Sequence, residues 1–430
     1  MGNLTKEEPK MKRRPTSRII RNMAMFLAVF GPATITAMAD NDASGVATYS
    51  IAGAKLGYPI LFLLLIITVL LGITQEMGMR LTLISRKGLA DLIRERFGVK
   101  AAFFIFSALL FANMGTIIGD MSAIKTTATM LKIPPIPTVI FIVVLIYFFV
   151  TKGNYKLTQN IMLLSCLFYL AYIISAIRAR PDWGLAISNL VYPHVVAFTP
   201  EYLKNYLLIG MGVLGTTITP WGQFFVSSFA FDKRIEAKNV KYSQTETYLG
   251  AFLTDFFSFF MIVATAATLF VNSIPLVSGE QAALAIKPFA GELAGSLFAL
   301  GILNAGFMGI VVVSLSTAYA FSEFFGLSGS LNTSFSQSKT FYVIFIGQLV
   351  VAAVIIMFPA INLFQLVIIT QSINAMALPL VFYYLIRLAN NKQLMKAYVN
   401  NAFQKYFSIA ATVVIIIASV FAVVATILNF

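Results

Sequence analysis

The sequence predicts an all-α integral membrane protein of about eleven transmembrane helices, with helices 1 and 6 broken within a five-plus-five inverted repeat. Of the 430 residues, 59% are hydrophobic and only 11% are charged, whereas soluble domains are about a quarter charged. Apolar runs of roughly 20 residues, the length that spans a bilayer, recur along the chain. Two of these runs are interrupted at matching places in the two halves, and paired breaks of this kind are typical of a transporter's substrate site.

The apolar runs give each element in order. We expect helix 1 over 20–54 with its break at 40–45, and helix 6 over 204–230 with its break at 215–222. The other helices are expected at 58–82, 101–131, 135–151, 157–178, 244–271, 292–325, 339–357, 360–388 and 406–428. The predicted organisation is an N-terminal tail (1–19), a first repeat (20–179), a loop (180–203), a second repeat (204–388) and helix 11 (389–430). Because the halves show no convincing residue-level similarity, the repeat depends on the positions of the breaks.

Basic residues predict the orientation in a cell membrane. The segment before the first apolar run contains Lys6, Lys10, Lys12, Arg13, Arg14, Arg18 and Arg21. The loops after helices 2, 6 and 10 are also rich in Lys and Arg, which favours the cytoplasmic side for all of them. We therefore expect a cytoplasmic N-terminus, an extracellular loop 180–203 and an extracellular C-terminus. This placement accounts for the net charge of +14 without a nucleic-acid partner.

The chemistry of most enzymes is missing from the sequence. Cys166 is the single cysteine and His194 the single histidine, so neither a disulfide nor a Ser-His-Asp triad can form within one chain. We expect no enzyme activity and no cofactor. The sequence makes no prediction of the oligomeric state.

The break in helix 1 holds the strongest candidate for a binding residue. Asp42 is a carboxylate at membrane depth beside an unwound turn, which suits a hard cation. The alternative is a helix cap or an ion pair, but helix 1 has no Lys or Arg near it. Asn41 is a further candidate ligand. Asp40 lies two positions from Asp42 and can point to the opposite side, so it faces either the site or its access path.

The break in helix 6 offers oxygen atoms. Pro220 leaves the carbonyl of Thr216 without its usual helical partner, and Thr219 supplies a hydroxyl or room for a water. Gln223 follows in the same helix as a candidate. Simple kink geometry is the alternative explanation for these residues. We expect Trp221 to be a packing wall.

Helix 10 and several charges complete the candidate set. Gln371 and Asn374 lie one turn apart in an apolar run, where buried amides need a partner, either a cation with its waters or another helix. Asp120 and Lys125 in helix 3 can pair or reach the helix ends. Asp255 and Glu323 are further intramembrane charges, and no role beyond an aqueous pathway is assigned to any of these charges.

Several motifs resemble the Nramp family of divalent metal transporters, over helices 1 to 10. Asp42-Ala43-Ser44-Gly45 falls where that family has Asp-Pro-Gly-Asn, and Ala52 to Tyr58 fixes the register. Similar stretches run from Arg80 to Phe97 and from Gly301 to Gly326, and Gln371 followed by Leu378-Pro379 resembles the family's helix 10. The resemblance implies the LeuT-type inverted repeat.

The departures from the family pattern resemble its magnesium-transporting branch. The family's site methionine falls at Thr219, and its motif asparagine falls at Gly45. The helix 6 histidines fall at Trp221 and Val226, and the acidic position of helix 3 falls near Gly119. Loss of the methionine removes a soft sulfur ligand, and we expect the smaller side chains to widen the site for a partly hydrated Mg²⁺.

We therefore expect a transporter that imports Mg²⁺, and also Mn²⁺, by alternating access and without proton coupling. The first alternative is a proton-coupled Mn²⁺/Fe²⁺ importer of the ordinary Nramp type. The second is an amino-acid or other organic-solute carrier of the same fold, for which two site aspartates would be unfavourable. The expected partners are the metal ion and the lipid bilayer.

Overall fold

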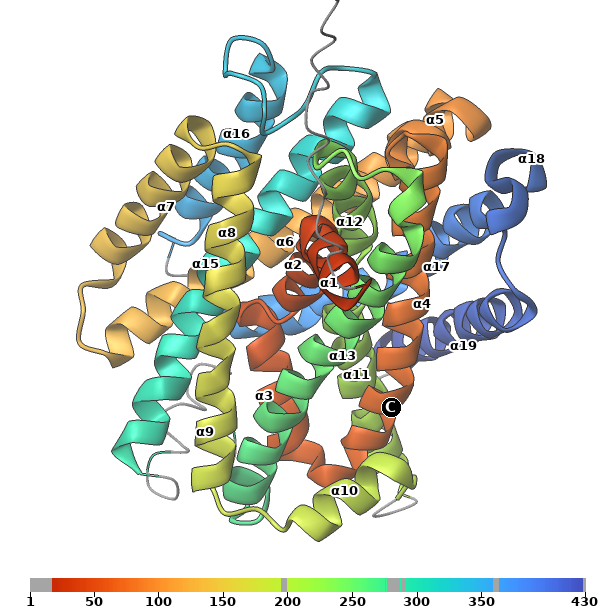
Figure 1. Ribbon diagram of the computed structural model, residues 1–430. Helices are drawn as coiled ribbons and strands as arrows, with labels where there is room; N and C mark the ends of the chain where they lie inside the picture. Colours follow the sequence, from red (N-terminus) through yellow and green to blue (C-terminus); the bar gives the residue numbers. More distant parts are fainter. Residues whose placement is uncertain are drawn as a thin grey trace, which may run out of the picture.

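The computed structural model describes residues 18–194, 199–274, 276, 287, 291–358 and 363–427. These residues form a helical bundle, and no β-strand occurs among them (Figure 1). The predicted helix 1 corresponds to α2 (Pro32–Ala39) and α3 (Ala43–Leu56), and helix 6 to α11 (Pro200–Thr217) and α12 (Pro220–Asp232). Both predicted breaks are therefore present, although each is shorter than the sequence suggested.

The remaining crossings follow the predicted order closely. They are α4 (Leu61–Ser85), α6 (Val99–Met130), α7 (Pro135–Lys152), α8 with α9 (Tyr155–Ser165 and Leu170–Arg178), α13 (Val240–Thr265), α15 (Glu292–Phe325), α16 (Lys339–Ile355), α17 (Leu363–Ala389) and α19 (Ala402–Ile427). In the described part of the chain, eight helices are long and apolar enough to cross a membrane alone. The shorter α16 and the two broken helices supply the other predicted crossings, so the chain is an all-α membrane protein of the predicted class.

Short helices mark the two ends of the bundle. The helices α5 (Leu89–Phe97) and α18 (Lys392–Met395) lie near the top of Figure 1, and α10 (Trp183–Val191) lies at the bottom. The basic loops after helices 2 and 10 thus share one end, opposite the predicted extracellular loop. This arrangement agrees with the alternation of loops between the two sides of the membrane that the basic residues predict. The orientation in a membrane and the boundaries of the repeats stay predictions. The first 17 residues of the predicted tail lie outside the described residues.

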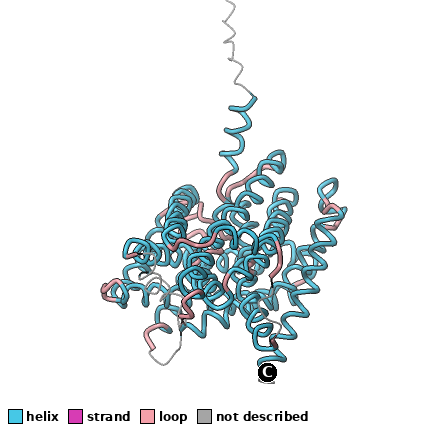
Figure 2. Tube along the Cα trace, turned by 90° about the horizontal axis from the view of Figure 1, so that it is seen from below, coloured by secondary structure: helices cyan, strands magenta, loops and turns pink. Residues whose placement is uncertain are grey.

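The start of helix 1 was predicted wrongly. Residues Arg18–Val29 form a separate helix, α1, which bends by 53° from α2 and projects from the bundle in Figure 2. Gly31 adopts a φ of 140° at the bend, which only glycine tolerates readily. Pro32 then starts α2 at a position where its missing N–H costs nothing. The apolar run alone could not reveal this change of direction.

Two charged side chains hold the elbow between α1 and α2. Glu246 of α13 accepts hydrogen bonds at Oε1 from the backbone N–H groups of Gly31, Ala33 and Thr34, at 2.7, 3.0 and 3.1 Å. Lys233 donates to the carbonyls of Val29 and Phe30 at the end of α1. A carboxylate at a helix N-terminus and an ammonium at a helix C-terminus both complement the helix dipole. The first half of helix 1 is therefore anchored by residues more than 200 positions away.

Glu246→Ala is expected to destabilise the protein by about 2–4 kcal/mol, because three buried N–H groups lose their acceptor. Glu246→Gln keeps an acceptor oxygen and is expected to lose less. Thermal unfolding in a nonionic detergent measures both. Glu201→Ala, in the exposed first turn of α11, is the control and should unfold as the unmodified protein does. An equal loss in both alanine variants would contradict a specific role for Glu246.

Candidate cation site at the two helix breaks

The two helix breaks meet in the middle of the bundle. The half-helix α2 packs against α12, and α3 packs against α11, so the two broken helices run side by side in opposite directions. A hydrogen bond of 2.9 Å from the Thr219 hydroxyl to Asp40 Oδ1 joins the breaks directly. Asp40, Asp42, Thr216 and Thr219 are each at most 2% exposed. The breaks therefore form one buried polar centre.

Asp42 occupies the N-cap position of α3. Its Oδ1 accepts a hydrogen bond of 2.6 Å from the backbone N–H of Gly45. Asp42 therefore caps the helix, which was the alternative to a cation ligand. A carboxylate has two oxygens and about four acceptor sites. The cap uses one of these sites, which leaves the carboxylate able to bind a cation as well. The cap also fixes the direction in which the charge points.

Gly45 does not widen the site, contrary to the expectation from the sequence. A Cβ atom at this position would lie 2.7 Å from the carbonyl oxygen of Asp40 and 2.9 Å from Thr216 Oγ1. The volume of the missing side chain is thus occupied by another backbone and by a hydroxyl. Gly45 permits a close approach between the two broken helices, and it brings Thr216 Oγ1 next to the Asp42 carboxylate.

Asp40 and Asn41 are directed away from Asp42. Asp40 accepts from Thr219 at Oδ1 and from Gln75 Nε2 at Oδ2, the latter at 3.2 Å. Asn41 donates to the carbonyl of Thr254 and accepts from the Ser258 hydroxyl, each at 2.8 Å. Both of these partners of Asn41 are in α13. In this structure α13 therefore engages both ends of the Asn41 amide, and a role for Asn41 as a ligand stays a prediction.

The hydroxyl of Thr219 is already engaged. It accepts from the backbone N–H of Gly222, at 3.0 Å, as the N-cap of α12, and it donates to Asp40. Thr219 therefore organises the break and supports Asp40. Gln223 lies further along α12, fully buried, and neither atom of its amide has a hydrogen-bond partner among the described residues. The indole of Trp221 is fully buried, as a packing wall would be.

Helix α17 reaches the site through Gly215. A Cβ atom at Gly215 would collide with the carbonyl oxygen of Gln371, so the two backbones are in contact there. Asn374 Nδ2 donates to Gln371 Oε1 at 2.9 Å and to Thr116 Oγ1 at 3.3 Å. Asn374 thus makes the interhelical hydrogen bond that the alternative expected, to Thr116 of α6, whereas the bond between Asn374 and Gln371 lies within α17. The other ends, Gln371 Nε2 and Asn374 Oδ1, have no partner among the described residues.

Asp120 is the site residue that the sequence reasoning missed. Its Oδ1 accepts from the backbone N–H and the hydroxyl of Ser44, at 3.0 and 3.1 Å, in the first turn of α3. A Cβ atom added to Gly309 of α15 would collide with Asp120 Oδ2 and lie 2.5 Å from the Asp42 Cβ. Asp120 and Asp42 therefore meet over Gly309. The available signal was a carboxylate in the long apolar helix α6. The pairing with Lys125 that the sequence suggested drew attention away from a role in the site.

The other charges considered in the sequence, Lys125, Glu323 and Asp255, make no hydrogen bond to Asp40 or Asp42 within the described residues. Lys125 donates to the carbonyl of Ile356 at 2.6 Å, so the suggested pairing with Asp120 is absent. Glu323 accepts from the Ser228 hydroxyl and from the backbone N–H of Ala90 at the start of α5. Asp255 is 4% exposed, and neither carboxylate oxygen has a hydrogen-bond partner in the described chain.

Two buried oxygen atoms without partners among the described residues lie beside Asp42. Thr216 Oγ1 approaches it at Gly45 and Asp120 Oδ2 approaches it at Gly309. Buried polar atoms normally find hydrogen-bond partners, and the water molecules of a hydrated cation would donate to these acceptors. No group of three or more His, Cys, Asp or Glu side chains able to hold a metal ion occurs among the described residues. The arrangement suits a cation that is moved through the protein with some of its waters.

A family model matches most of the chain. The model described as "Natural resistance-associated macrophage protein-like" matches residues 33–425. A divalent metal cation transporter of Verminephrobacter eiseniae is 23% identical over 398 residues, covering 89% of this chain and 86% of the relative. One from Caldanaerobacter subterraneus is 22% identical over 401 residues, with 89% and 90% of the two chains covered.

The fold is similar to that of a solved transporter. The crystal structure of a manganese transporter of Eremococcus coleocola superposes with a TM-score of 0.77 at 18% sequence identity. The superposition covers 95% of this chain and 88% of that one. At this identity the likeness establishes the shared fold.

Proposed function

The chain belongs to the Nramp family of divalent metal transporters, and we propose that it imports Mg²⁺, and also Mn²⁺, by alternating access across a cell membrane. Its relatives from Verminephrobacter and Caldanaerobacter are named divalent metal cation transporters, and its structural neighbour is a manganese transporter. Membership of the Nramp family implies a divalent metal ion as the class of substrate, and it implies the LeuT-type fold. The choice of Mg²⁺ depends on the residues of this chain.

The donor set at the two breaks is the observation that supports Mg²⁺. Asp42 contributes a carboxylate and Thr216 a hydroxyl and a carbonyl. Thr219, whose hydroxyl binds Asp40 and Gly222, brings no sulfur atom to the site. Thioether ligands select softer metals, whereas oxygen ligands suit Mg²⁺ and Mn²⁺. Mg²⁺ gives up its waters reluctantly, and the unpartnered acceptors around Asp42 can receive hydrogen bonds from those waters. Asp42 is the proposed direct ligand; Gln223, Gln371 and Asn374 are proposed to contact the waters.

Uptake into proteoliposomes tests this proposal against its alternatives. We expect Mg²⁺ and Mn²⁺ to enter, and amino acids to neither bind nor enter. Competition by Fe²⁺ or Cd²⁺ far stronger than that by Mg²⁺ would instead support the ordinary manganese and iron importer. Isothermal titration of the purified protein with the same ions provides a measurement that does not depend on transport.

Thr219→Met is expected to shift the ratio of Cd²⁺ to Mg²⁺ affinity by about tenfold toward Cd²⁺, or about 1.4 kcal/mol, because it adds a soft donor beside the site. Thr219→Leu is the matched control, since it removes the same hydroxyl and cap without adding sulfur. Titration of both variants with the two metals measures the ratio. An equal change in the methionine and leucine variants would show that position 219 does not reach the ion.

Transport is also proposed to proceed without proton coupling. Helix 6 has no histidine, and His194 lies in the loop after α10. A pH-sensitive dye trapped in the liposomes should report no acidification when external Mg²⁺ is saturating. Asp120 is the carboxylate that touches the first turn of α3. An acidification that depends on the metal and disappears in Asp120→Asn would restore the proton-coupled alternative.

A further inference from the structure

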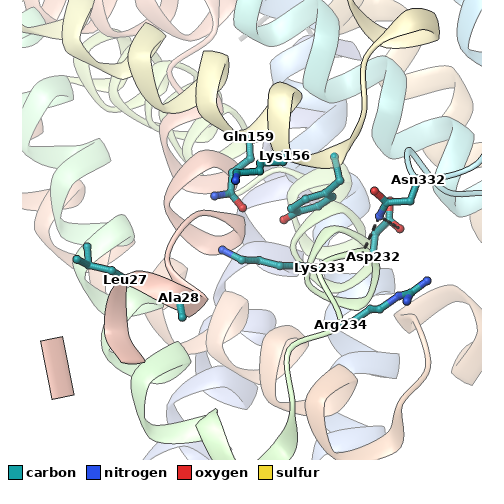
Figure 3. Close-up of a pocket in the computed structure, with 9 residues that line it drawn as sticks. Leu27, Ala28, Lys156, Gln159, Asp232, Lys233, Arg234 and Asn332 are labelled. Carbon is teal, nitrogen blue, oxygen red and sulfur yellow. Dashed lines mark hydrogen bonds between the residues drawn. The ribbon is translucent and has the colours of Figure 1, made fainter. Parts of the chain in front are cut away.

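A pocket of about 580 Å³ lies beside the elbow between α1 and α2 (Figure 3). It is at the end of the bundle that the basic loops predict to be cytoplasmic. Leu27 belongs to α1, Lys156 to the first turn of α8, and Lys233 and Arg234 follow the end of α12. The pocket thus connects the first half of helix 1 with helices 5 and 6, and it is separate from the cation site.

The pocket carries an excess of positive charge. Three of its lining side chains are basic, namely Lys156, Lys233 and Arg234, and Asp232 is the acidic one among those that line it. The Asp232 carboxylate is already satisfied by other donors, which are the Tyr319 hydroxyl, the Ser330 hydroxyl, the Leu331 N–H and the Asn332 amide. In Figure 3 Asp232 lies beside Asn332, away from Lys156. The basic groups therefore remain available to an anion.

Donors in this pocket have unused capacity. The Lys233 ammonium carries three N–H groups, and the carbonyls of Val29 and Phe30 take two of them. Burial lowers the pKa of Lys233 to about 8, with nearby Glu246 acting in the opposite direction, so the group stays protonated at neutral pH. The hydroxyl of Tyr155 lines the same pocket, is 6% exposed as a residue, and has no hydrogen-bond partner among the described residues.

The helix α1 beside this pocket has an exposed apolar face. Ile20, Met23 and Leu27 are 58%, 56% and 61% exposed, and α1 projects away from the bundle (Figure 2). Exposed apolar residues three and four positions apart form one helix face, and such a helix lies in the interface with that face among the acyl chains. Leu27 of this face also lines the pocket, so an acyl chain that lies along α1 would bring its headgroup to the basic residues.

We propose that this pocket binds the phosphate headgroup of an anionic phospholipid, with the acyl chains lying along the exposed face of α1. The phosphodiester would bridge Lys156, Lys233 and Arg234, and the Tyr155 hydroxyl would donate to it. A lipid held there ties the elbow to α8 and to the end of α12. It therefore stabilises the position of α2, the half-helix that leads to Asp40.

The test uses the purified full-length chain in a nonionic detergent and short-chain probes. Dioctanoyl phosphatidylglycerol is expected to raise the midpoint of thermal unfolding by about 3 °C or more. Dioctanoyl phosphatidylcholine, which has no net charge, should raise it much less. Glycerol 3-phosphate supplies the phosphate without acyl chains and should have little effect. An equal shift with the zwitterionic lipid, or with glycerol 3-phosphate, would overturn the proposal.

Matched variants distinguish lipid binding in the pocket from an effect of surface charge in general. Lys156→Gln with Arg234→Gln should remove most of the shift caused by phosphatidylglycerol. Lys392→Gln with Lys396→Gln removes the same charge at α18, at the same end of the bundle, and should retain the shift. Arg234 and Lys396 both have a positive φ, of 59° and 51°, so each pair replaces one residue of this kind. If both pairs lose the shift equally, the effect is unspecific and the proposal fails. If the first pair does not fold, Lys156→Gln against Lys392→Gln makes the same comparison.

Discussion

Asp42→Asn is expected to abolish uptake of Mg²⁺ and Mn²⁺ while the thermal stability of the protein stays close to its original value. Asparagine caps a helix about as well as aspartate, so the hydrogen bond from Gly45 to position 42 can persist. What disappears is the negative charge at the point where the two broken helices meet. A divalent cation that is partly stripped of water in a buried site needs such a charge.

Asp42→Ala extends this test. It removes the charge and the cap together, and it is expected to abolish uptake and also to cost about 1 kcal/mol of stability. Uptake into proteoliposomes and thermal unfolding in detergent measure the two effects separately. Normal Mg²⁺ uptake by a well-folded Asp42→Asn protein would place the site elsewhere.

Gly309→Ala is expected to reduce uptake by about 100-fold or more, although it adds only one methyl group. Its Cβ would collide with Asp120 Oδ2 and lie 2.5 Å from the Asp42 Cβ, so both carboxylates must move. Overpacking of this kind costs about 1–3 kcal/mol of stability, and a shift of the ligand by about 1 Å can cost about 100-fold in rate.

Gly347→Ala is the control for this substitution. Gly347 lies in α16, where an added Cβ would meet nothing within 4 Å. This variant should transport metal as the original protein does, and it should unfold at the same or a slightly higher temperature because alanine favours the helix. Unchanged uptake by Gly309→Ala would show that Asp42 and Asp120 can separate without harm, and that their close approach is not needed for transport.

Much of the candidate site could be predicted from single positions. A carboxylate beside an unwound turn identified Asp42, and Pro220 identified the second break, because both signals depend on the local chain and on the cost of polar groups in a membrane. The directions of Asp40 and Asn41 could not be predicted. An unwound segment has no fixed periodicity, so the direction of each side chain depends on the residues of other helices that hydrogen-bond to it.

The tertiary structure changed the interpretation of two further residues, Gly45 and Asp120. Gly45 was expected to open space, but the Thr216 hydroxyl and the Asp40 carbonyl occupy it. The sequence assigns Asp120 no role beyond an aqueous pathway, whereas in the structure it binds Ser44 and lies against Gly309. Both outcomes depend on the distance between helices that are far apart in the chain.

The sequence by itself determined the class of the protein, the order of its crossings and the positions of the two breaks. Hydrophobic length, Pro and Gly act locally, so their consequences can be derived from neighbouring residues. Only the tertiary structure decided that α1 turns away from α2, because Glu246 and Lys233 hold that elbow from more than 200 residues away. It also decided that Asp120 joins Asp42, because a carboxylate in a helix acquires partners only when other helices pack against it.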